Sequence, residues 1–285
     1  MLHKKWWKLL SFILLLYTCT YGFLVKVPKL DDRMQESIRN FFFHVPMWFG
    51  MMILLFVSLV YSIKYLRSSN LVHDVYAQAY AAMGLIFGVL GIITGALWAN
   101  YQWGSPWVGD PKQNGAAIAL LIYFAYFVLR GSLVDAEKKA RLSAVYNVFS
   151  FFMLFPTLWI LPRLTESLHP GGQGSDGNPG INGKDMSANM RTVFYPAVIG
   201  WTLLGVWITT LKIRVQMIQL KKKASYNHTI IKYMLTLLQA EQAASQSIML
   251  QNGKIFLVMA VVCIVLIGLF LYVTSIDKKI KQLEK

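Results

Sequence analysis

The segment from Trp103 to Lys112 gathers, in one short connection, residue types that can hold a ligand. It contains the indoles of Trp103 and Trp107, the carboxylate of Asp110 and the amine of Lys112, and it lies between two long apolar stretches. Indoles offer broad apolar faces to a flat partner, and the other two side chains add charge. We therefore expect this loop to contact a flat ligand that is partly apolar and partly charged.

Two histidines, His44 and His169, fall on the same side of a membrane as this loop if the N-terminus is cytoplasmic. A haem iron takes one or two axial ligands, most often imidazole. Either histidine taken alone is more typical of an interfacial residue that hydrogen-bonds to backbone or water, but their shared side with a tryptophan loop favours haem. Trp48 follows His44 by four residues, so both lie on one helical face, where Trp48 could line the floor of the site.

The composition indicates a membrane protein. Of the 285 residues, 56% are hydrophobic and only 14% are charged. A soluble domain of this length needs more polar surface than that to cover its core. The chain is therefore expected to lie in a lipid bilayer.

Apolar runs long enough to cross a bilayer, roughly 17 to 25 residues each, predict an all-α fold. We expect a polytopic transmembrane helix bundle with six core spans and one C-terminal span, Ile255–Ser275. The fourth core span is short, so we expect its N-terminal end to include part of Asn114–Gly115. The six core spans are expected near Leu9–Val25, Val45–Leu66, Tyr76–Trp98, Ala116–Leu129, Ala144–Leu161 and Val193–Leu211.

The third span carries four glycines at spacings of four, three and four residues: Gly84, Gly88, Gly91 and Gly95. These spacings place all four on one helical face. Small residues on one face allow a neighbouring helix to approach closely. We interpret this pattern as a packing feature and not as a catalytic one.

Lysines and arginines indicate the orientation of the bundle. With a cytoplasmic N-terminus, the inner segments up to residue 232 hold fifteen of them and the outer segments between the first six spans hold eight. Cytoplasmic loops are enriched in these residues, so the tryptophan loop and both histidines are expected outside. Much of the +15 net charge then follows from topology and requires no nucleic-acid partner.

The glycine-rich stretch after His169 contains a literal G-x-G-x-x-G, Gly172–Gly177. A dinucleotide site requires this motif between a strand and a helix, whereas here it lies between membrane spans. A flap over a ligand is the better interpretation, because glycine changes conformation at low steric cost. The sequence contains no G-x-x-x-x-G-K-[ST] motif, so any use of ATP is expected to belong to a partner.

Three stretches together resemble a known family: Gly95–Trp98, Trp103–Asp110 and Leu120–Tyr123. They are similar to the tryptophan-rich "WWD" region of CcmC, the haem exporter protein C family of cytochrome c biogenesis. His44-Val45-Pro46 and His169 look like that family's two axial-histidine motifs. The resemblance covers roughly residues 10 to 215.

The resemblance implies a multi-pass protein of the bacterial inner membrane, with its site facing the periplasm. It implies transient binding of haem b, with His44 and His169 as axial ligands, and transfer to a haem chaperone of the CcmE type. ABC-type ATPase and permease subunits of the maturation complex are the other implied partners, besides membrane lipid. No nucleic acid is expected, and the protein is not expected to be an enzyme.

The tryptophan loop departs from the family pattern. Pro106 and Gly109 stand where the family has indoles, and Lys112 stands where it often has arginine. The platform for a porphyrin is therefore expected to be smaller. We expect the cations for the haem propionates to come from Arg39, Lys112 or Arg191, and expect Asp110 to orient the loop or a basic neighbour.

The sequence divides into three parts. Residues 1–220 are the expected CcmC-like six-helix domain, residues 221–251 a basic helical linker, and residues 252–285 a single helix with a charged tail that resembles CcmD. Six spans return the chain to the cytoplasm, so a seventh places the tail outside, whereas CcmD proteins usually keep it inside. The orientation of the last span stays open.

Two alternatives compete with this interpretation. A cytochrome c synthetase (haem lyase) of the related tryptophan-rich family would itself attach haem to apocytochrome, but such proteins usually have more spans and histidines. A haem or small-molecule transporter subunit would be expected to carry charged residues in mid-membrane. The third to sixth spans contain none there.

Overall fold

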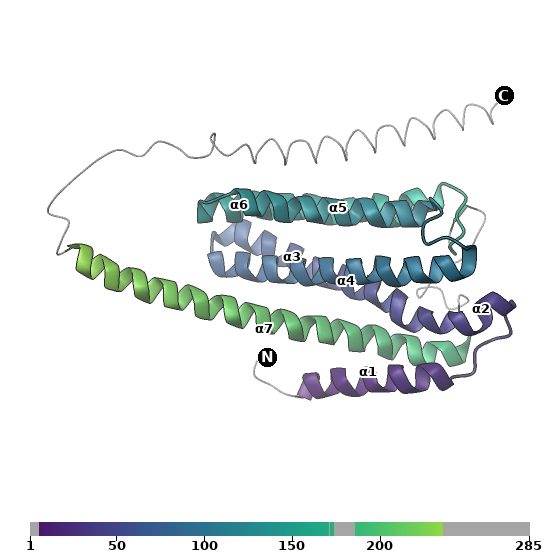
Figure 1. The fold of residues 1–285 in the computed structure, drawn as a ribbon. Helices are drawn as coiled ribbons and strands as arrows, with labels where there is room; N and C mark the ends of the chain where they lie inside the picture. The colour runs from purple at the N-terminus through teal and green to yellow at the C-terminus, as the bar shows by residue number, and fades with distance from the viewer. Residues whose placement is uncertain (1–5, 171, 174–185, 236–285) are drawn as a thin grey trace, which may run out of the picture.

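The computed structural model describes residues 6–170, 172–173 and 186–235 (Figure 1). This described part consists of helices and the loops between them. The α-helices are α1 (Trp6–Leu24), α2 (Asp32–Ser37), α3 (Phe41–Ser68), α4 (Leu71–Trp103), α5 (Pro111–Ser132), α6 (Ala136–Phe155) and α7 (Ala188–Leu235). Three short segments complete the set: the 3-10 turns η1 (Ile38–Asn40) and η3 (Leu161–Arg163), and the π-helical turn η2 (Pro156–Ile160).

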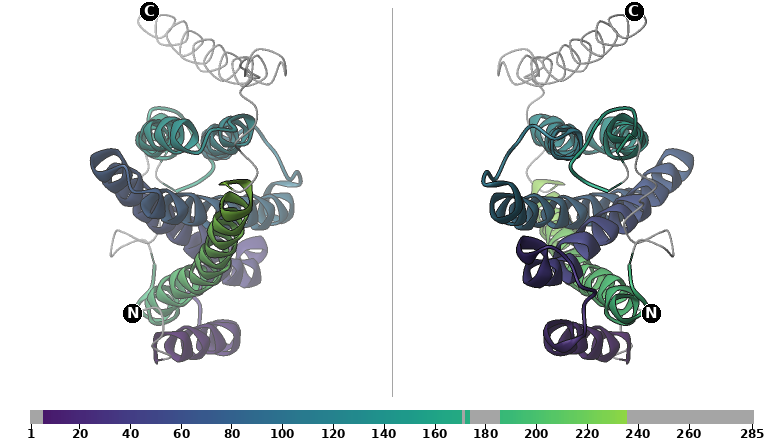
Figure 2. Two further views of the ribbon diagram at one scale, coloured as in Figure 1. Left: turned by 90° about the vertical axis from the view of Figure 1, so that its left-hand side faces the viewer. Right: turned by 90° about the vertical axis from the view of Figure 1, so that its right-hand side faces the viewer.

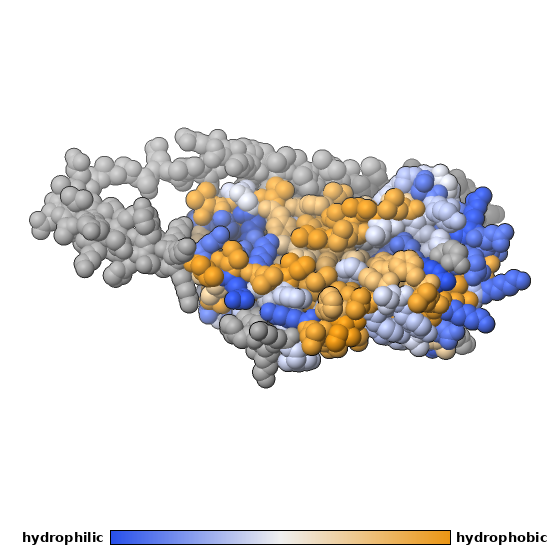
Figure 3. Space-filling model, turned by 60° about the horizontal axis from the view of Figure 1, so that its bottom comes forward, coloured by the Kyte–Doolittle hydropathy of each residue, from blue (hydrophilic) through white to orange (hydrophobic). Residues whose placement is uncertain are grey.

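All six predicted core spans are confirmed, because the described residues contain six helices long and apolar enough to cross a membrane. Hydrophobic residues form a broad band across the middle of the face drawn in Figure 3, and hydrophilic residues gather toward its ends. The predicted C-terminal span, Ile255–Ser275, lies outside the described residues, as does most of the glycine-rich stretch after His169.

The helices lie roughly along one axis in successive layers (Figures 1 and 2). Helices α5 and α6 form one layer, α3 and α4 the next, and α7 and α1 follow on the other side. We call the outer end the one that carries α2, the connection 104–110 and the segment 164–170. Helix α7 continues without a break past residue 220, where the sequence suggested that the six-helix part ends.

Capping residues define the tryptophan loop. Helix α4 ends at Gly104, whose φ of 76° places it in the left-handed region that glycine adopts easily. Helix α5 begins with Asp110 as N-cap, whose carboxylate accepts a hydrogen bond from the backbone N–H of Lys112, and with Pro111 in the first turn. The loop between these two helices is therefore short, and both of its ends are fixed by helix caps.

The glycines of α4 lie against α3. A Cβ atom built on each glycine would fall 2.6 to 2.8 Å from a side-chain atom of α3, closer than real Cβ contacts allow. The α3 residues met by Gly84, Gly88, Gly91 and Gly95 are Leu55, Met51, Trp48 and His44, in that order. The glycine face is thus a packing surface, as expected, and its outer half positions two residues of the predicted ligand site.

Candidate haem site

One cavity opens at the outer end, between α3, α4, the start of α5 and the η2–η3 segment. Together with its open mouth it holds about 1180 Å³ of space that no protein atom fills. The cavity is lined by His44, Val45, Trp48, Phe49, Met52, Gly91, Ile92, Gly95, Ala96, Trp107, Lys112, Gln113, Ala116, Leu158, Trp159, Arg163 and His169.

The cavity brings together five of the eight residues that the sequence proposed for the site: His44, Trp48, Trp107, Lys112 and His169. The other three proposed residues, Trp103, Asp110 and Arg191, are all described by the structure but do not line the cavity. Two of these, Trp103 and Asp110, contact the His169 ring from outside the cavity. The third, Arg191, lies in the first turn of α7.

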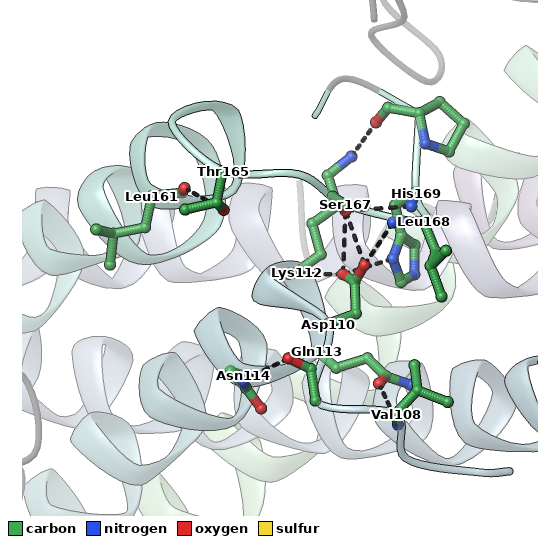
Figure 4. Close-up of polar contacts among 12 residues, drawn as sticks. Val108, Asp110, Lys112, Gln113, Asn114, Leu161, Thr165, Ser167, Leu168 and His169 are labelled. Atoms are coloured by element: carbon green, nitrogen blue, oxygen red, sulfur yellow. Dashed lines mark hydrogen bonds and ion pairs between the residues drawn. The ribbon is translucent and has the colours of Figure 1, made fainter. Parts of the chain in front are cut away.

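The carboxylate of Asp110 joins the tryptophan loop to the segment that carries His169 (Figure 4). Its Oδ1 lies 2.8 Å from Nδ1 of the His169 ring. It also accepts hydrogen bonds from the Ser167 hydroxyl at 2.9 Å, the Leu168 backbone N–H at 2.7 Å and the Lys112 backbone N–H at 2.8 Å. Asp110 is buried, and its carboxylate is held by donors from the segment 167–169 and from the first turn of α5.

These donors keep Asp110 ionised. Burial alone would raise the pKa of Asp110, but the His169 side chain and the N–H groups of Leu168 and Lys112 outweigh it and hold this pKa well below its usual range. An ionised carboxylate only accepts hydrogen bonds, so Nδ1 of His169 carries the proton. In the neutral imidazole, Nε2 then keeps its lone pair for a metal. A histidine that binds a metal typically has such a carboxylate partner.

His44 has a different partner. Its Nδ1 lies 3.1 Å from the hydroxyl oxygen of Thr94 on α4. That hydroxyl has one proton, which it donates to the carbonyl oxygen of Leu90 at 2.8 Å. The oxygen of Thr94 therefore accepts from Nδ1–H of His44, and Nε2 of His44 is again the nitrogen with a lone pair.

The indoles divide into two roles. Trp107 lines the cavity and is 42% exposed, so part of its face is accessible to a ligand. Trp103 instead packs edge-to-face on His169, with ring centroids 5.0 Å apart. Trp48 and Trp98 contact the His44 ring in the same way, at 6.3 and 6.0 Å. Three indoles thus contact the histidines, and Trp48, Trp107 and Trp159 contribute surface to the cavity itself.

The cations also differ from the expected set. Lys112 lines the cavity, and its ammonium donates to the Pro170 carbonyl (Figure 4). The Arg39 guanidinium donates to the carbonyls of Gly22 and Val25 at 3.1 and 3.0 Å, where it caps the end of α1. The cation that the sequence interpretation missed is Arg163, which lines the cavity.

Arg163, Leu158 and Trp159 reach the cavity because α6 does not continue as a regular helix. At Pro156 the helix passes into the π-turn η2, and proline has no N–H for the helical ladder. Gly115 of α5 has its Cα against the carbonyl oxygen of Thr157, where a Cβ would overlap that oxygen. The two prolines at Pro156 and Pro162 were the only sequence signal of this change.

The chain matches the family model "CcmC: Heme exporter protein C" over residues 2–228 and the model "CcmD family protein" over residues 229–284. It is 25% identical to Heme exporter protein C of Paracoccus denitrificans over 196 residues. The aligned stretch covers 69% of this chain and 78% of that protein. It is 21% identical over 196 residues to Heme exporter protein C of Haemophilus influenzae, with 66% and 75% covered.

A second group of relatives matches over a shorter stretch. Cytochrome c biogenesis protein CcsA of Thermosynechococcus vestitus is 50% identical over 96 residues, 33% of this chain and 29% of that protein. CcsA of Pelargonium hortorum is 42% identical over 124 residues, with 42% and 37% covered. Since the CcmC model covers most of the chain, the resemblance is confirmed: this multi-pass membrane protein belongs to the CcmC family of haem-handling proteins of cytochrome c biogenesis, and a CcmD family region follows.

Proposed function

We propose that this protein binds haem b transiently in the outer-end cavity, with His44 and His169 as axial ligands of the iron. One observation carries the proposal: both imidazoles line a single cavity, and the Nδ1 atom of each lies within hydrogen-bond distance of a protein oxygen, at 3.1 Å for His44 and 2.8 Å for His169. Both rings therefore keep Nε2 for a metal. Haem iron with two imidazole ligands is a common arrangement.

The rest of the cavity suits the two parts of a porphyrin. Val45, Phe49 and Trp107 offer apolar surface to the ring. Lys112 and Arg163 lie in the same lining, and their positive charges favour the carboxylates of the propionates. Because Arg39 caps α1 and Arg191 lies apart from the lining, Arg163 takes the place that the sequence interpretation gave to those two arginines.

The protein is proposed to hand haem on without covalent chemistry of its own. The membership of the CcmC family supports a periplasmic haem site in the bacterial inner membrane and transfer to a haem chaperone of the CcmE type. The CcmD region supports assembly with ABC-type ATPase and permease subunits. We keep residues 1–220 as the haem-handling part, 221–251 as the linker and 252–285 as a fused small subunit.

The test is an absorption spectrum of the purified full-length protein. Haem bound as proposed gives the low-spin spectrum of bis-imidazole iron, in both the ferric and the ferrous state. A high-spin spectrum, or no retained haem after the protein is incubated with haemin and desalted, would overturn the ligand assignment.

A second function is favoured by the stretch shared with CcsA proteins. In that case the chain would attach haem covalently to apocytochrome, as a synthetase. Incubation of the haem-loaded protein with an apocytochrome peptide containing Cys-x-x-Cys-His distinguishes the two. Thioether-linked haem on the peptide, without any other subunit, would support the synthetase and contradict the transfer function.

A further inference from the structure

The imidazole of His44 is held from the neighbouring helix by two consecutive residues, Thr94 and Gly95 of α4. His44 itself belongs to α3, in the first turns after Phe41. The position of the proposed iron ligand therefore depends on how closely α4 approaches α3 at this level of the bundle.

Gly95 leaves room for the ring. A Cβ on Gly95 would lie 2.7 Å from Cε1 of His44, 3.3 Å from Nδ1 and 3.4 Å from Nε2. Since real Cβ contacts almost never fall under 3.0 Å, alanine at this position requires the ring to move. Trp48 and Trp98 contact the ring edge-on, so the side on which the ring can move is the cavity that it lines.

Thr94 sets the rotation of the same ring. Its hydroxyl oxygen accepts from Nδ1–H of His44, because its proton is donated to the Leu90 carbonyl. The backbone carbonyl of Thr94 also accepts a hydrogen bond from the Asn40 side chain at 3.3 Å, which ties this turn of α4 to the start of α3. One residue thus fixes the tautomer of His44, and the next fixes how close its ring lies to α4.

We propose that Thr94 and Gly95 are positioning residues for the His44 ligand: Thr94 directs Nε2 to the iron, and Gly95 provides the space in which the ring lies. This inference rests on the proposed function. It assigns to the outer glycine of the α4 face a role that the inner glycines do not have, because Gly84 and Gly88 meet aliphatic or thioether side chains away from any proposed ligand.

The first test compares Gly95→Ala with Gly84→Ala in the full-length protein. Both substitutions add a Cβ on the same face of α4, at 2.7 Å from His44 and 2.6 Å from Leu55 respectively, so both are expected to lower thermal stability. Only Gly95→Ala is expected to convert low-spin ferric haem to a high-spin form, and added imidazole should restore the low-spin spectrum.

A wild-type spectrum in Gly95→Ala, or an equal spectral change in Gly84→Ala, would overturn the inference. The wild-type protein is measured in parallel. If the wild-type protein shows no histidine-ligated haem, the proposed function itself is wrong. If the wild-type protein shows bis-imidazole haem and Gly95→Ala shows the same spectrum, only the positioning role is wrong.

The second test uses Thr94 and does not depend on Gly95→Ala folding. Thr94→Val keeps the shape of the side chain and removes the acceptor, whereas Thr94→Ser keeps the hydroxyl. Loss of such a partner typically lowers metal affinity about 10- to 100-fold. We expect Thr94→Val to bind haem more weakly, with a shifted reduction potential, and Thr94→Ser to stay near wild type. Equal affinity and potential in all three proteins would contradict the role of Thr94.

Discussion

The two proposed iron ligands are held by different means. His44 lies on a long helix, and its ring is placed by a missing side chain at Gly95, a neutral hydroxyl at Thr94 and the edges of two indoles. His169 lies in a loop, and its ring is placed by the ionised carboxylate of Asp110. One ligand is positioned by shape and the other by charge.

The difference follows from where each residue lies. Within the bundle a carboxylate would be costly to bury, while two close-packed helices can define a position to a fraction of an ångström. At the loop, the packing on the His169 ring comes from Trp103 at the end of α4, and an anion with several donors provides the remaining order. The two halves of the site should therefore respond differently to substitution.

The largest effects are expected from removing the ligands. His44→Ala and His169→Ala each delete an axial imidazole while leaving every membrane span intact. We expect both to lose the low-spin haem spectrum with little change in the amount of protein in the membrane. Absorption spectra and immunoblots of membrane fractions measure the two quantities. Two wild-type spectra would show that neither histidine binds iron.

Asp110→Asn is expected to have the next largest effect. Asparagine is as good an N-cap as aspartate, so α5 should still begin at Pro111. The charge that holds the His169 ring is lost, and we expect haem affinity to fall about 10- to 100-fold. Haem titration of the purified variant measures this.

Asp135→Asn provides the matched control for that variant. Asp135 is the N-cap of α6 at the inner end, where it accepts a hydrogen bond from the Lys138 backbone N–H at 2.7 Å. It has the same capping role as Asp110 and no contact with a proposed ligand. A loss of affinity in both variants would mean that capping, and not the His169 contact, explains the result.

Gly115→Ala tests the contact between α5 and the η2 turn, two elements that border the cavity. The new Cβ would overlap the Thr157 carbonyl, so the η2 turn has to move, at a cost of about 1 to 3 kcal/mol. We expect a lower melting temperature and weaker haem binding. Gly131→Ala on the same helix serves as the control, because a Cβ there meets nothing within 4 Å. Equal melting temperatures for both variants would contradict the tight contact.

The tryptophan loop should show a smaller effect. Trp107→Ala removes an apolar face beside the cavity, and we expect haem affinity to fall about threefold to tenfold, since an aromatic contact contributes about 0.5 to 1.5 kcal/mol. Trp103→Ala should act through His169 and alter the spectrum more than the affinity. Haem titrations and spectra of both variants in parallel separate these roles. If the two variants are indistinguishable, the division of roles is wrong.

The smallest expected effect is on pH dependence. The pKa of Asp110 is lower in the folded protein than in the unfolded chain, so its stabilising contribution is complete above the ordinary aspartate pKa, declines progressively below it, and is fully lost once pH falls through the lowered value. The difference in melting temperature between wild type and Asp110→Asn should therefore persist through mild acid. If the difference disappears near the ordinary aspartate pKa, the carboxylate is not held as described.

The sequence alone determined that the chain has six core membrane spans and roughly where each lies, because span length and hydropathy are local properties that the bilayer imposes. It did not determine where the helices end, since α7 continues well beyond its predicted span. It also identified His44, Asp110 and His169 as residues of one site, through motif spacing and the side of the membrane on which each lies. The resemblance to the CcmC family came from the same residues, and the family match confirms it.

Only the tertiary structure decided how these residues contact one another. Arg39 caps α1 and Arg163 lines the cavity, although both are arginines on the same side of the membrane and sequence cannot tell them apart. The π-turn after Pro156 turns Trp159 toward the cavity, and Gly95 becomes part of the site because α3 places His44 against it. These outcomes depend on contacts between residues far apart in the chain, and the local pattern of a single helix carries no information about its neighbour.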